Sequence, residues 1–485
     1  MKFKKPKKFE YNSVVIGAGS AGLVTSYITA LLKAKVALVE KHKMGGDCLN
    51  SGCVPSKALI KSAKIFGMAK NAKKYGLKSV TIDFEFSDIM KRVQEVIKKI
   101  EPHDSVERYT GLGVECIKGN ALIKSPWEVE VNSHILTTKN IVIATGASPL
   151  LPKFEGLKDI NYVTSDNLWQ IKNLPKKLVV LGGGAIGCEL SQCFARFGSE
   201  VTQVERSERL MPREDIEVSN VIEQKFKSEG VTILTGFSAK KFYKKSDQQY
   251  LVVESVMGEI KEIEFDVVLI ALGRKPNTEN IGLETLGLEL NINGTLKLDP
   301  YLRTPKYKNI FACGDVAGPY QFTHMAAHQA WFTSINSLFQ PFKKYKVDYS
   351  VVPWATFTDP EVATVGINEM NAKLQNLNYE ATTYSLEKND RAVADSENEG
   401  FVKVITKKGT DKILGATIVS PSASDMLIEF ISAMKHGYGL NRIMSTIHPY
   451  PAKSEANKFA ASTWKQKHKP EWVFKYLELF HRFRR

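Results

Sequence analysis

The sequence has few cysteines and no long apolar segment. Its 485 residues include six cysteines, which is too few for the disulfide framework of a secreted domain. No stretch reaches the roughly 18 uninterrupted apolar residues that a membrane-spanning helix requires. The basic N-terminus runs directly into a strand pattern and lacks the apolar core of a signal peptide. We therefore expect a cytosolic location, and the length predicts about two to four domains.

The net charge of +15 is concentrated at the two ends of the chain. Residues 1–10 carry five lysines against one glutamate, and residues 465–485 carry seven basic residues against two glutamates. These ends hold +9 of the total, so the rest of the chain is only mildly basic. This distribution argues against nucleic acid as a main partner.

An apolar run followed by a glycine-rich turn comes directly after the basic start. Tyr11 to Ile16 is rich in β-branched residues and predicts a buried strand. A turn containing Gly17, Gly19 and Gly22 follows. A helical stretch and a second apolar strand come next, and that strand ends at Glu40. The glycines permit a tight turn beside a pyrophosphate at the helix N-terminus, and Glu40 can accept hydrogen bonds from ribose.

The same order of strand, glycine turn, helix and strand recurs between residues 178 and 205. The glycines of this second turn are Gly182, Gly184 and Gly187. Two such units predict two nucleotides, namely a tightly held flavin and an exchangeable nicotinamide coenzyme. Glu205 at the strand end favours NADH, because a carboxylate would repel the 2′-phosphate of NADPH. Arg206 and Arg209 lie close by and could offset that repulsion, so NADPH stays an alternative.

Cys48 and Cys53 lie five positions apart in the segment GGDCLNSGCVPSK, residues 45–57. Two thiols at this spacing can form a small-loop disulfide that is easily opened. The flanking glycines allow the backbone to approach a flat partner closely. We interpret the pair as a redox-active disulfide beside a cofactor, and the alternative is two ordinary buried cysteines.

Three later apolar runs end in small or acidic residues. One ends in Thr145 and Gly146, and a second ends in Gly273. Each predicts a strand that closes a nucleotide-binding domain. The third run ends in Gly-Asp, and Asp315 can cap the next turn and bind a hydroxylated cofactor chain. From about residue 346 the pattern changes to strands and helices without a glycine fingerprint, which predicts a separate α+β domain.

Taken in order, these motifs resemble the class I pyridine nucleotide-disulfide oxidoreductases, which include dihydrolipoamide dehydrogenase, glutathione reductase and mercuric reductase. The resemblance covers about residues 10–463 and rests on GAGSAG, GGDCLNSGCVPSK, IVIATG, LGGGAIGCE, ALGRKPN and IFACGDVAG. It implies an α/β fold with two Rossmann-like nucleotide-binding domains, for FAD and NAD(P), and a C-terminal α+β dimerisation domain. It also implies a homodimer in which the partner's C-terminal domain completes each active site.

The resemblance also predicts domain boundaries. Residues 1–160 and 280–345 would form the FAD-binding domain and its central segment, and residues 161–279 the NAD(P)-binding domain. Residues 346–463 would be the dimerisation domain, and residues 464–485 a basic aromatic tail.

The matching motifs imply roles for individual residues. Cys48 would be the interchange thiol that meets the substrate, and Cys53 the thiolate that lies against the isoalloxazine. Lys57 would approach the flavin N5 side and pair with Glu189, because a cation stabilises the reduced anion and a carboxylate keeps the lysine in place. Further cofactor-binding residues implied by the resemblance are Thr145, Gly146, Gly273, Arg274 and Asp315.

The C-terminal active-site motif departs from the family pattern His-Pro-x-x-x-Glu, in which the histidine protonates the leaving thiolate. Residues 448–455 read HPYPAKSE and permit two alignments. One places Tyr450 at the histidine position and keeps Glu455. The other keeps His448 but puts Lys453 where the glutamate belongs. We prefer the first alignment because its Pro-x-x-Ser-Glu spacing is intact.

A tyrosine at this position resembles mercuric reductase. A phenol, with a pKa of about 10, is a poor proton relay for thiols at neutral pH. Mercuric reductases also carry a C-terminal cysteine pair, which is missing here because the last cysteine is Cys313, and no N-terminal CxxC domain precedes the first strand. Efficient Hg(II) detoxification is therefore not expected. His448 stays a second candidate acid, with a packed or capping histidine as the alternative.

His324 follows the Gly-Asp motif at a predicted helix start. By position it should lie under the flavin, as a polar contact to the ring or as a ligand to a substrate metal. The alternative is a helix-capping or core histidine. The sequence predicts no resident metal site.

The final segment combines aromatic and basic residues. Trp472, Tyr476, Leu479 and Phe483 fall on one face of a predicted helix with basic flanks. This pattern is typical of a helix that lies in a membrane interface, and it also fits a helix that docks on the protein's own surface. We therefore hypothesise weak association with the inner face of an anionic membrane.

These observations predict an FAD-dependent NAD(P)H oxidoreductase that passes electrons to a Cys48–Cys53 disulfide and on to an unidentified acceptor. The acceptor would be a metal ion, a small disulfide or a quinone, and the nearest resemblance is to mercuric reductase. The alternatives are a dihydrolipoamide dehydrogenase and a membrane-associated flavin redox sensor.

Overall fold

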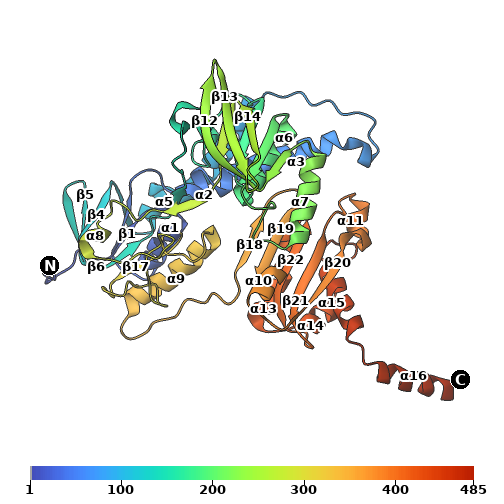
Figure 1. Cartoon of the computed structure of the whole chain (residues 1–485). Coiled ribbons are helices and arrows are strands. Elements are labelled where there is room, and N and C mark those ends of the chain that lie inside the picture. Colours follow the sequence, from blue (N-terminus) through green and yellow to red (C-terminus); the bar gives the residue numbers. More distant parts are fainter. Residues whose placement is uncertain (1–2) are drawn as a thin grey trace. The chain divides into compact units, whose positions relative to one another are not determined.

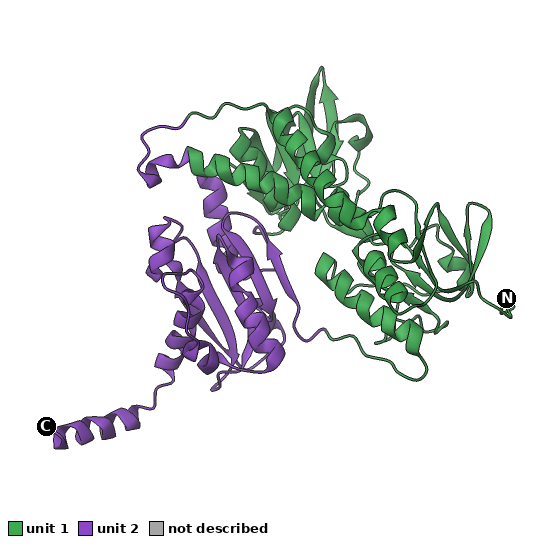
Figure 2. Cartoon of the chain, turned by 180° about the vertical axis from the view of Figure 1, so that it is seen from behind, with its two compact units in different colours: residues 1–69, 81–208, 229–348 green, residues 70–80, 209–228, 349–485 purple. Residues whose placement is uncertain are grey.

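The computed structural model describes residues 3–485, which form two compact units (Figure 2). Unit 1 runs to residue 69 and contains residues 81–208 and 229–348, whereas unit 2 contains residues 70–80, 209–228 and 349–485. Unit 2 therefore takes in two short segments that lie, in sequence, within the predicted nucleotide-binding domains. The four domain boundaries proposed from the sequence stay predictions.

The first sheet of unit 1 is built around β1 (Tyr11–Ile16), which pairs in parallel with β2 (Val36–Glu40) and β6 (His134–Ile143). Its order is β3-β2-β1-β6-β5-β4, and β17 also pairs with β6. The added strands are β3 (Val114–Lys118), β4 (Ala121–Ser125), β5 (Glu128–Val131) and β17 (Ile310–Ala312). Helices α1 (Ser20–Leu31) and α9 (Thr323–Phe339) pack against each other beside this sheet (Figure 1).

Both faces of the first sheet are buried. Val14 and Ile16 belong to one apolar cluster, whereas the intervening Val15 belongs to another. Side chains alternate across a strand, so β1 must be covered on both sides. This explains why the strand reads as a continuous apolar run, as parallel strands usually do.

The second sheet of unit 1 repeats this arrangement. Its order is β11-β10-β9-β15-β8, so β9 takes the place of β1 and β10 that of β2. The strands are β8 (Tyr162–Val163), β9 (Lys177–Leu181), β10 (Glu200–Glu205), β11 (Thr232–Thr235) and β15 (Val267–Ile270). Helix α6 (Ala185–Phe197) connects β9 to β10. An antiparallel sheet lies beside it, formed by β12 (Phe237–Lys245), β13 (Gln248–Ser255) and β14 (Ile260–Phe265).

Shorter elements complete unit 1. The redox motif spans α2 (Gly46–Asn50) and the start of α3 (Cys53–Lys70). Strands β7 (Ala147–Pro149) and β16 (Arg274–Pro276) form a two-stranded antiparallel sheet that joins the IVIATG and ALGRKPN segments. The remaining helices are α4 (Phe86–Ile100), α5 (Val106–Gly111) and α8 (Leu283–Leu286).

Unit 2 is an antiparallel sheet covered by helices. The strand order is β18-β19-β22-β21-β20. These strands are β18 (Pro353–Thr356), β19 (Glu361–Gly366), β20 (Tyr379–Ser385), β21 (Phe401–Lys407) and β22 (Ile413–Ser420). The helices of this unit are α7 (Ile216–Ser228), α10 (Glu369–Leu374), α11 (Asp390–Ala394), α12 (Ala423–Met426), α13 (Ile428–His436), α14 (Leu440–Ser445) and α15 (Glu455–Lys467).

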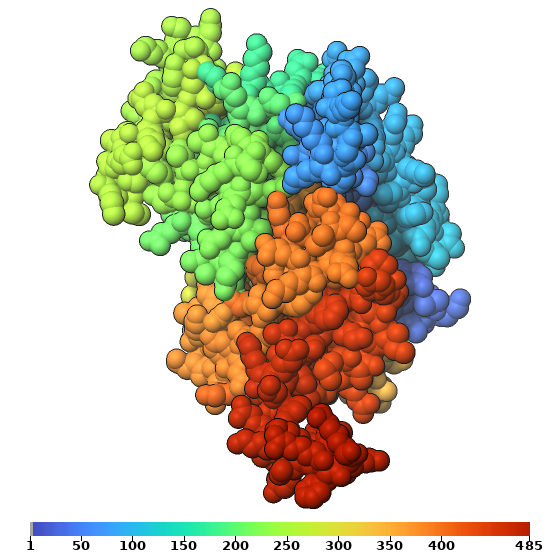
Figure 3. Space-filling model, turned by 90° about the vertical axis from the view of Figure 1, so that its right-hand side faces the viewer, coloured from blue at the N-terminus to red at the C-terminus, as the bar shows by residue number. Residues whose placement is uncertain are grey.

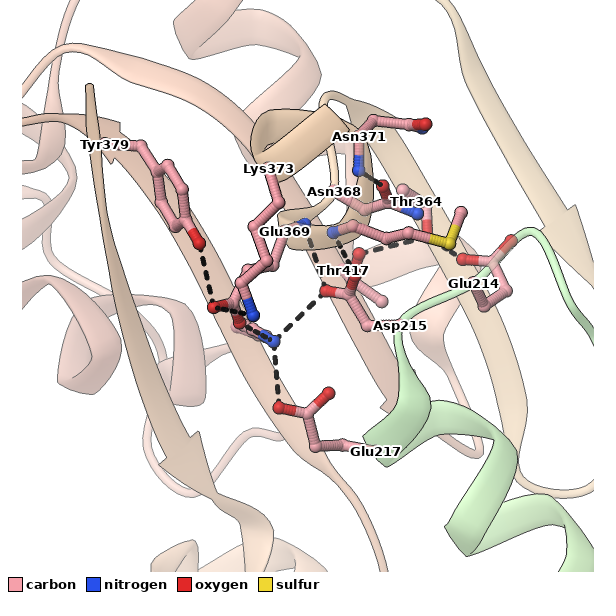
Figure 4. Close-up of polar contacts among 12 residues, drawn as sticks. Glu214, Asp215, Glu217, Thr364, Asn368, Glu369, Asn371, Lys373, Tyr379 and Thr417 are labelled. Atoms are coloured by element: carbon pink, nitrogen blue, oxygen red, sulfur yellow. Dashed lines mark hydrogen bonds and ion pairs between the residues drawn. The ribbon is translucent and has the colours of Figure 1, made fainter. Parts of the chain in front are cut away.

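Buried charges hold residues 209–228 within unit 2. Lys403 on β21 is 3% exposed and pairs with Asp215 at 3.1 Å, Glu217 at 3.0 Å and Glu369 at 2.5 Å (Figure 4). Burial would raise the pKa of Glu369, but hydrogen bonds led by the one from Lys403 bring it down to about 2. Three carboxylates thus compensate one buried ammonium, which is the condition for a stable buried charge.

The last helix, α16 (Glu471–Phe483), has no buried residue. Its atoms lie at the surface, at the red end of the colour scale in Figure 3. Within residues 3–485, no helix has the length and apolar character needed to cross a membrane.

Candidate active site

The two glycine turns have matching backbone geometry. Gly17 and Gly182 have φ angles of 103° and 114°, in the left-handed region that glycine tolerates best. Helices α1 and α6 each begin after a glycine with φ near −78°, and neither has a side-chain cap. Their N-terminal N–H groups are therefore available to an anion.

An acidic residue closes each turn in the same way. Glu40 Oε2 accepts a hydrogen bond from Ala18 N at 2.7 Å. Glu205 Oε2 accepts one from Gly183 N at 2.5 Å. Each carboxylate is thus fixed at the end of the second strand, where nucleotide-binding folds hold the ribose hydroxyls.

The space around the glycines fits two dinucleotides. A Cβ on Gly22 would lie 1.8 Å from Gly17 O, and one on Gly187 would lie 2.1 Å from Gly182 O, so helix and strand pack too closely for a side chain. A Cβ on Gly184 would meet no atom of the described chain within 4 Å, apart from its immediate neighbours. Close packing at the third glycine and open space at the second are the requirements for binding a pyrophosphate.

The redox loop packs directly on the first glycine turn. Gly45 N donates a hydrogen bond to Ala18 O at 2.9 Å. A Cβ on Gly46 would lie 2.6 Å from Gly19 Cα, so the two backbones touch. Cys48 lies within α2, two residues after Gly46. The nucleotide site and the cysteines therefore share one continuous surface.

Cys48 and Cys53 are free thiols in the structure, and Cys53 is the more exposed. A hydrogen bond from the Cys48 thiol lowers the pKa of Cys53 to about 6, with Thr323 and the charge of Lys57 acting in the same direction. The same bond raises the pKa of Cys48. Thr323 Oγ1, at the start of α9, lies 3.3 Å from Cys53 Sγ. Cys53 is therefore the thiolate of the pair at neutral pH, and Cys48 keeps its proton.

Lys57 and Glu189 meet as an ion pair. Lys57 Nζ lies 3.0 Å from Glu189 Oε2, although 132 positions separate them in sequence. The Glu189 side chain is 7% exposed and that of Lys57 is 37% exposed. Glu189 lies on α6 and Lys57 on α3, so the pair links the second glycine-turn helix to the redox helix.

Arg274 connects the redox loop to the Gly-Asp motif. Its guanidinium lies 2.5 Å from Asp47, the residue before Cys48, and 3.7 Å from Asp315. Burial raises the pKa of Asp315 to about 6, and the charge of Arg274 opposes this rise. A carboxyl group with this pKa is mostly ionised at neutral pH and can accept hydrogen bonds from a hydroxylated chain.

Thr145 and Gly146 are held by Asn277. Thr145 Oγ1 donates to Asn277 O at 2.7 Å, and Asn277 Nδ2 donates back to Thr145 O at 2.8 Å. Asn277 N also donates to Gly146 O, and Gly273 lies just before this β-bridge. The two closing segments of the nucleotide-binding region are thus joined to each other.

His324 lies in the first turn of α9, directly after Thr323, and is exposed. Its ring stacks on Phe322 at a centroid distance of 5.3 Å. The structure thus places His324 one residue from the side chain that contacts Cys53. Its predicted role toward the flavin or a substrate metal stays a prediction.

The three residues of the C-terminal motif belong to unit 2 and have separate partners. The hydroxyl of Tyr450, which is exposed, donates to Asp390 Oδ2 at 2.9 Å. This hydrogen bond raises the pKa of Tyr450 above its ordinary value. His448 Nε2 instead lies 3.1 Å from Glu429 on α13, with its side chain 7% exposed, and Glu455 accepts from Ala452 N. Tyr450 is thus the outward-facing group of the three, and His448 is packed against a carboxylate.

Three residues of the site were not predicted from the sequence. Thr323, Asp47 and Asn277 were not singled out as functional, yet they contact Cys53, Arg274 and Thr145 respectively. Asp47 and Thr323 stand beside residues that were singled out, and this adjacency was the available signal. No local pattern shows that Thr323 faces Cys53 from 270 positions away.

Comparisons with known proteins agree with this geometry. Residues 11–330 match the family model described as pyridine nucleotide-disulphide oxidoreductase, and residues 352–461 match its dimerisation domain. A mercuric reductase of Bacillus cereus is 34% identical over 94% of this chain and 72% of its own length. A dihydrolipoyl dehydrogenase of Geobacillus stearothermophilus is 34% identical over 93% of this chain and 96% of its own length.

A solved structure is similar over nearly the whole chain. The Cu(II) complex of the HOCl-induced flavoprotein disulfide reductase RclA from Escherichia coli matches with a TM-score of 0.82 and 27% identity, covering 92% of this chain and 98% of its own. The predicted fold class, the flavoprotein oxidoreductase activity and the FAD and NAD(P)H requirement are thereby confirmed. The chain belongs to the pyridine nucleotide-disulphide oxidoreductase family.

Proposed function

We propose that this flavoprotein is an NADH-dependent reductase whose Cys48–Cys53 pair delivers electrons to a thiol-seeking metal ion such as Hg(II) or Cu(II). The observation that carries the proposal is the polarised thiol pair, in which Cys53 has a pKa of about 6 and Cys48 keeps its proton. Two similar proteins are named for such metals, one as a mercuric reductase and one as a Cu(II) complex.

The proposed reaction moves two electrons from NADH to the acceptor. When bound, FAD would supply the redox chemistry that links NADH oxidation to reduction of an adjacent disulfide. The Cys48–Cys53 disulfide takes up these electrons with one proton and opens to a Cys48 thiol and a Cys53 thiolate. Oxidation of the pair re-forms the S–S bond and releases one proton and two electrons, which reduce one Hg(II) to Hg(0) or two Cu(II) to two Cu(I).

The structure supports a division of labour between the two thiols. The pKa of Cys53 is lowered by Cys48, Thr323 and Lys57, which makes Cys53 the electron-rich sulfur beside the cofactor. Cys48, which lies on α2 two residues after Gly46, would meet the acceptor. Soft thiolates are preferred ligands of Hg- and Cu-type ions, so the chemistry of the pair fits such an acceptor.

Tyr450 supports a metal acceptor over a disulfide such as lipoamide. Reduction of a substrate disulfide requires a proton for the leaving thiolate, whereas reduction of a metal ion does not. Asp390 raises the pKa of the Tyr450 phenol, which makes it a weaker proton relay at neutral pH. His448, the other candidate acid, is packed against Glu429. Dihydrolipoamide dehydrogenase activity is therefore the second candidate function, favoured by the 34% identity to that enzyme.

Glu205 supports NADH as the coenzyme. Its carboxylate is fixed by Gly183 N at the strand end, where it would repel a 2′-phosphate. Arg209 donates to Pro212 O at 3.0 Å and to Glu214 O at 2.9 Å, so its guanidinium is occupied by main-chain acceptors. Arg206, which is exposed, is the remaining cation that could favour NADPH.

Reoxidation kinetics test the acceptor. The holoprotein would be reduced anaerobically with NADH and mixed in a stopped-flow instrument with Hg(II), Cu(II), lipoamide or a quinone such as menadione. We expect reoxidation by the metals to be faster than reoxidation by lipoamide and to be abolished in Cys48→Ser. Fast reoxidation by lipoamide would contradict the proposal and favour the dehydrogenase. Fast reoxidation by menadione alone would favour a quinone reductase, and slow reaction with all four would favour a redox sensor.

We also propose that the protein acts as a homodimer that contacts an anionic membrane surface through α16. The chain carries the family's dimerisation domain at residues 352–461. Seven large apolar side chains of α16 are exposed, namely Trp472, Phe474, Tyr476, Leu477, Leu479, Phe480 and Phe483. Basic residues at the end of the helix, with lysines before it, complement anionic headgroups, and this combination supports a bilayer as the occupant of the apolar face.

Vesicle co-sedimentation tests the membrane contact. Full-length protein is expected to pellet with phosphatidylglycerol vesicles and less with neutral phosphatidylcholine vesicles. Trp472→Glu combined with Phe483→Glu should leave it in the supernatant, whereas Ile292→Glu, at another fully exposed apolar site, should not. Full-length protein that stays in the supernatant with anionic vesicles would contradict the proposal. If this double variant lost membrane binding but kept its turnover with every acceptor, the result would favour a redox sensor that acts at the membrane.

A further inference from the structure

A cavity of about 440 Å³ lies at the opposite end of the first sheet from the glycine turn. Its lining includes Phe9, just before β1, Asn140 on β6, and Asn309, just before β17. Phe9 and Asn309 come before the first residues of β1 and β17, and Asn140 precedes Ile141, the β6 residue that pairs with Ile310. Gly17, in contrast, follows the carboxyl end of β1. β1 has six residues, so the cavity lies on the order of 20 Å from the glycine turn at about 3.3 Å per residue. It is therefore separate from the first glycine turn, and none of its lining residues belongs to the second.

The cavity carries an excess of positive charge. Five of its lining residues are cations, namely Lys5, Lys139, Arg303, Lys308 and Lys344. Arg303 and Lys308 share one carboxylate, that of Asp299, at 2.9 Å and 3.5 Å. Within residues 3–485, no carboxylate lies within ion-pair distance of the other three ammonium groups. Like charges around one cavity repel one another, and a bound anion would relieve that repulsion.

Aromatic rings form another part of the lining. Phe9 and Trp127 both line the cavity, and Lys5 Nζ lies 6.0 Å from the centroid of each ring. Lys344 Nζ lies 4.8 Å from the ring of Tyr301, so aromatic faces hold two of the lysines that lack a carboxylate. An indole face beside several cations suits a ligand that has both a flat ring and a multiply charged group.

The cavity floor is also preorganised. Gln340, the residue directly after α9, accepts a hydrogen bond from Arg303 Nη1 at 3.1 Å and donates one to Lys308 O at 3.0 Å. Asn309 Nδ2 donates to Pro126 O at 2.7 Å, next to Trp127. These bonds hold the strand ends and the α9 end in place, so a ligand would enter a formed site with little ordering cost.

We propose that this cavity binds a nucleoside polyphosphate, with the phosphates on the lysines and the base against Trp127. The site is independent of the proposed electron acceptor. It would take a ligand of the same chemical class as the nucleotide cofactors, but on a surface that neither glycine turn contributes to.

Calorimetry on the full-length holoprotein tests this site. ATP would be titrated in the presence of saturating NAD⁺, which occupies the coenzyme site. Lys139→Glu combined with Lys344→Glu is expected to weaken ATP binding at least tenfold. The matched control, Lys98→Glu with Lys99→Glu on α4, makes the same charge change at two exposed lysines and should leave binding unchanged. If both double variants weakened ATP binding equally, the effect would come from the net charge of the protein and not from this cavity, and the proposal would be overturned.

Two further measurements keep the test decisive. Flavin absorbance and NADH oxidation of the Lys139 and Lys344 variant should equal those of the wild type, which shows that it is folded. Trp127→Leu should bring the affinity for ATP down to that for inorganic tripolyphosphate, and a lack of effect would overturn the role of the base. Failure of ATP to bind, or its displacement by phosphatidylglycerol vesicles, would also overturn the proposal, in the second case in favour of a lipid headgroup.

Discussion

The two glycine turns of unit 1 have the same local geometry but different neighbours. In the first, Glu40 fixes Ala18 N, and in the second, Glu205 fixes Gly183 N. The redox loop packs on the first turn, where a Cβ on Gly46 would touch Gly19. At the second turn, the space next to Gly184 is open. We therefore expect the redox loop to enclose a nucleotide at the first turn, as FAD requires, and the open space at the second turn to leave a nucleotide exchangeable, as NADH requires.

The largest expected effect comes from filling the third glycine of each turn. Gly22→Ala places a Cβ 1.8 Å from a backbone oxygen in the enclosed turn, and we expect loss of FAD and of most folded protein. Gly187→Ala makes a similar clash, at 2.1 Å, in the open turn. It should keep FAD but slow NADH-dependent flavin reduction at least tenfold. Flavin content by absorbance and stopped-flow reduction measure the two effects.

Gly111→Ala is the control for this pair, because its Cβ would meet no atom of the described chain within 4 Å beyond its neighbours and its own helix backbone. It should keep both flavin content and reduction rate. If Gly187→Ala lost FAD as fully as Gly22→Ala, the two turns would not be functionally distinct and the comparison would fail.

The second prediction concerns the ion pair that links the two turns. Lys57→Met removes the cation 3.0 Å from the Glu189 carboxylate, whose side chain is 7% exposed. Because Lys57 is itself 37% exposed, we expect a moderate destabilisation of about 1–3 kcal/mol. Flavin reduction should also slow, because a cation beside the flavin stabilises its reduced anion. Urea unfolding and stopped-flow absorbance measure these changes.

A double variant separates the structural and electrostatic parts of this effect. Lys57→Met with Glu189→Gln removes both charges, so stability should recover while flavin reduction stays slow. Recovery of both stability and rate would show that Lys57 acts only through packing.

The third prediction concerns the thiol pair next to the first glycine turn, where the pKa of Cys53 is lowered to about 6. In the NADH-reduced holoprotein, the long-wavelength absorbance of a thiolate beside the flavin should be present at neutral pH and disappear as the pH falls through about 6. Thr323→Val removes a hydrogen bond that favours the thiolate, so the midpoint should rise toward the ordinary thiol value. An unchanged midpoint in Thr323→Val would contradict this contribution.

The buried cysteines provide the internal reference for this titration. Burial raises the pKa of Cys313 to about 11 and also raises that of Cys193. At neutral pH, iodoacetamide should therefore modify Cys53 of the reduced pair and leave these two unmodified, which peptide mass spectrometry would show.

The smallest expected effect concerns coenzyme choice at the open turn. Glu205→Ala removes the carboxylate that would repel a 2′-phosphate, so the KM for NADPH should fall and the preference for NADH should shrink about tenfold. Glu208→Ala, at an exposed acidic residue on the same segment, is the matched control. If Glu205→Ala left the preference for NADH over NADPH unchanged, other residues would determine the choice of coenzyme.

The local parts of this site could be predicted from the sequence. The strand, turn and helix around Gly17 and Gly182 follow from glycine conformation and apolar periodicity, which are short-range properties. The spacing of Cys48 and Cys53 likewise pointed to their chemistry. The pairing of Lys57 with Glu189 came from the family resemblance, since no local rule connects residues 132 positions apart.

The remaining features depend on contacts between distant segments. Thr323 reaches Cys53 only because α9 begins beside the redox helix. Residues 209–228 belong to unit 2 because Asp215 and Glu217 form ion pairs with Lys403, which lies on β21 of that unit. The partner of His448 proved to be Glu429 on α13 and not a residue of its own motif. Periodicity and spacing contain no information about such pairings.

Anaerobic titration of the holoprotein with NADH tests whether Cys48 and Cys53 form a redox-active disulfide beside the flavin. If they do, the oxidised wild type should consume twice as many reducing equivalents as Cys48→Ser, because the variant can reduce only its flavin. If the wild type and Cys48→Ser consumed equal amounts of NADH, the thiol pair would take no electrons. Cys48 and Cys53 would then not form a redox-active disulfide.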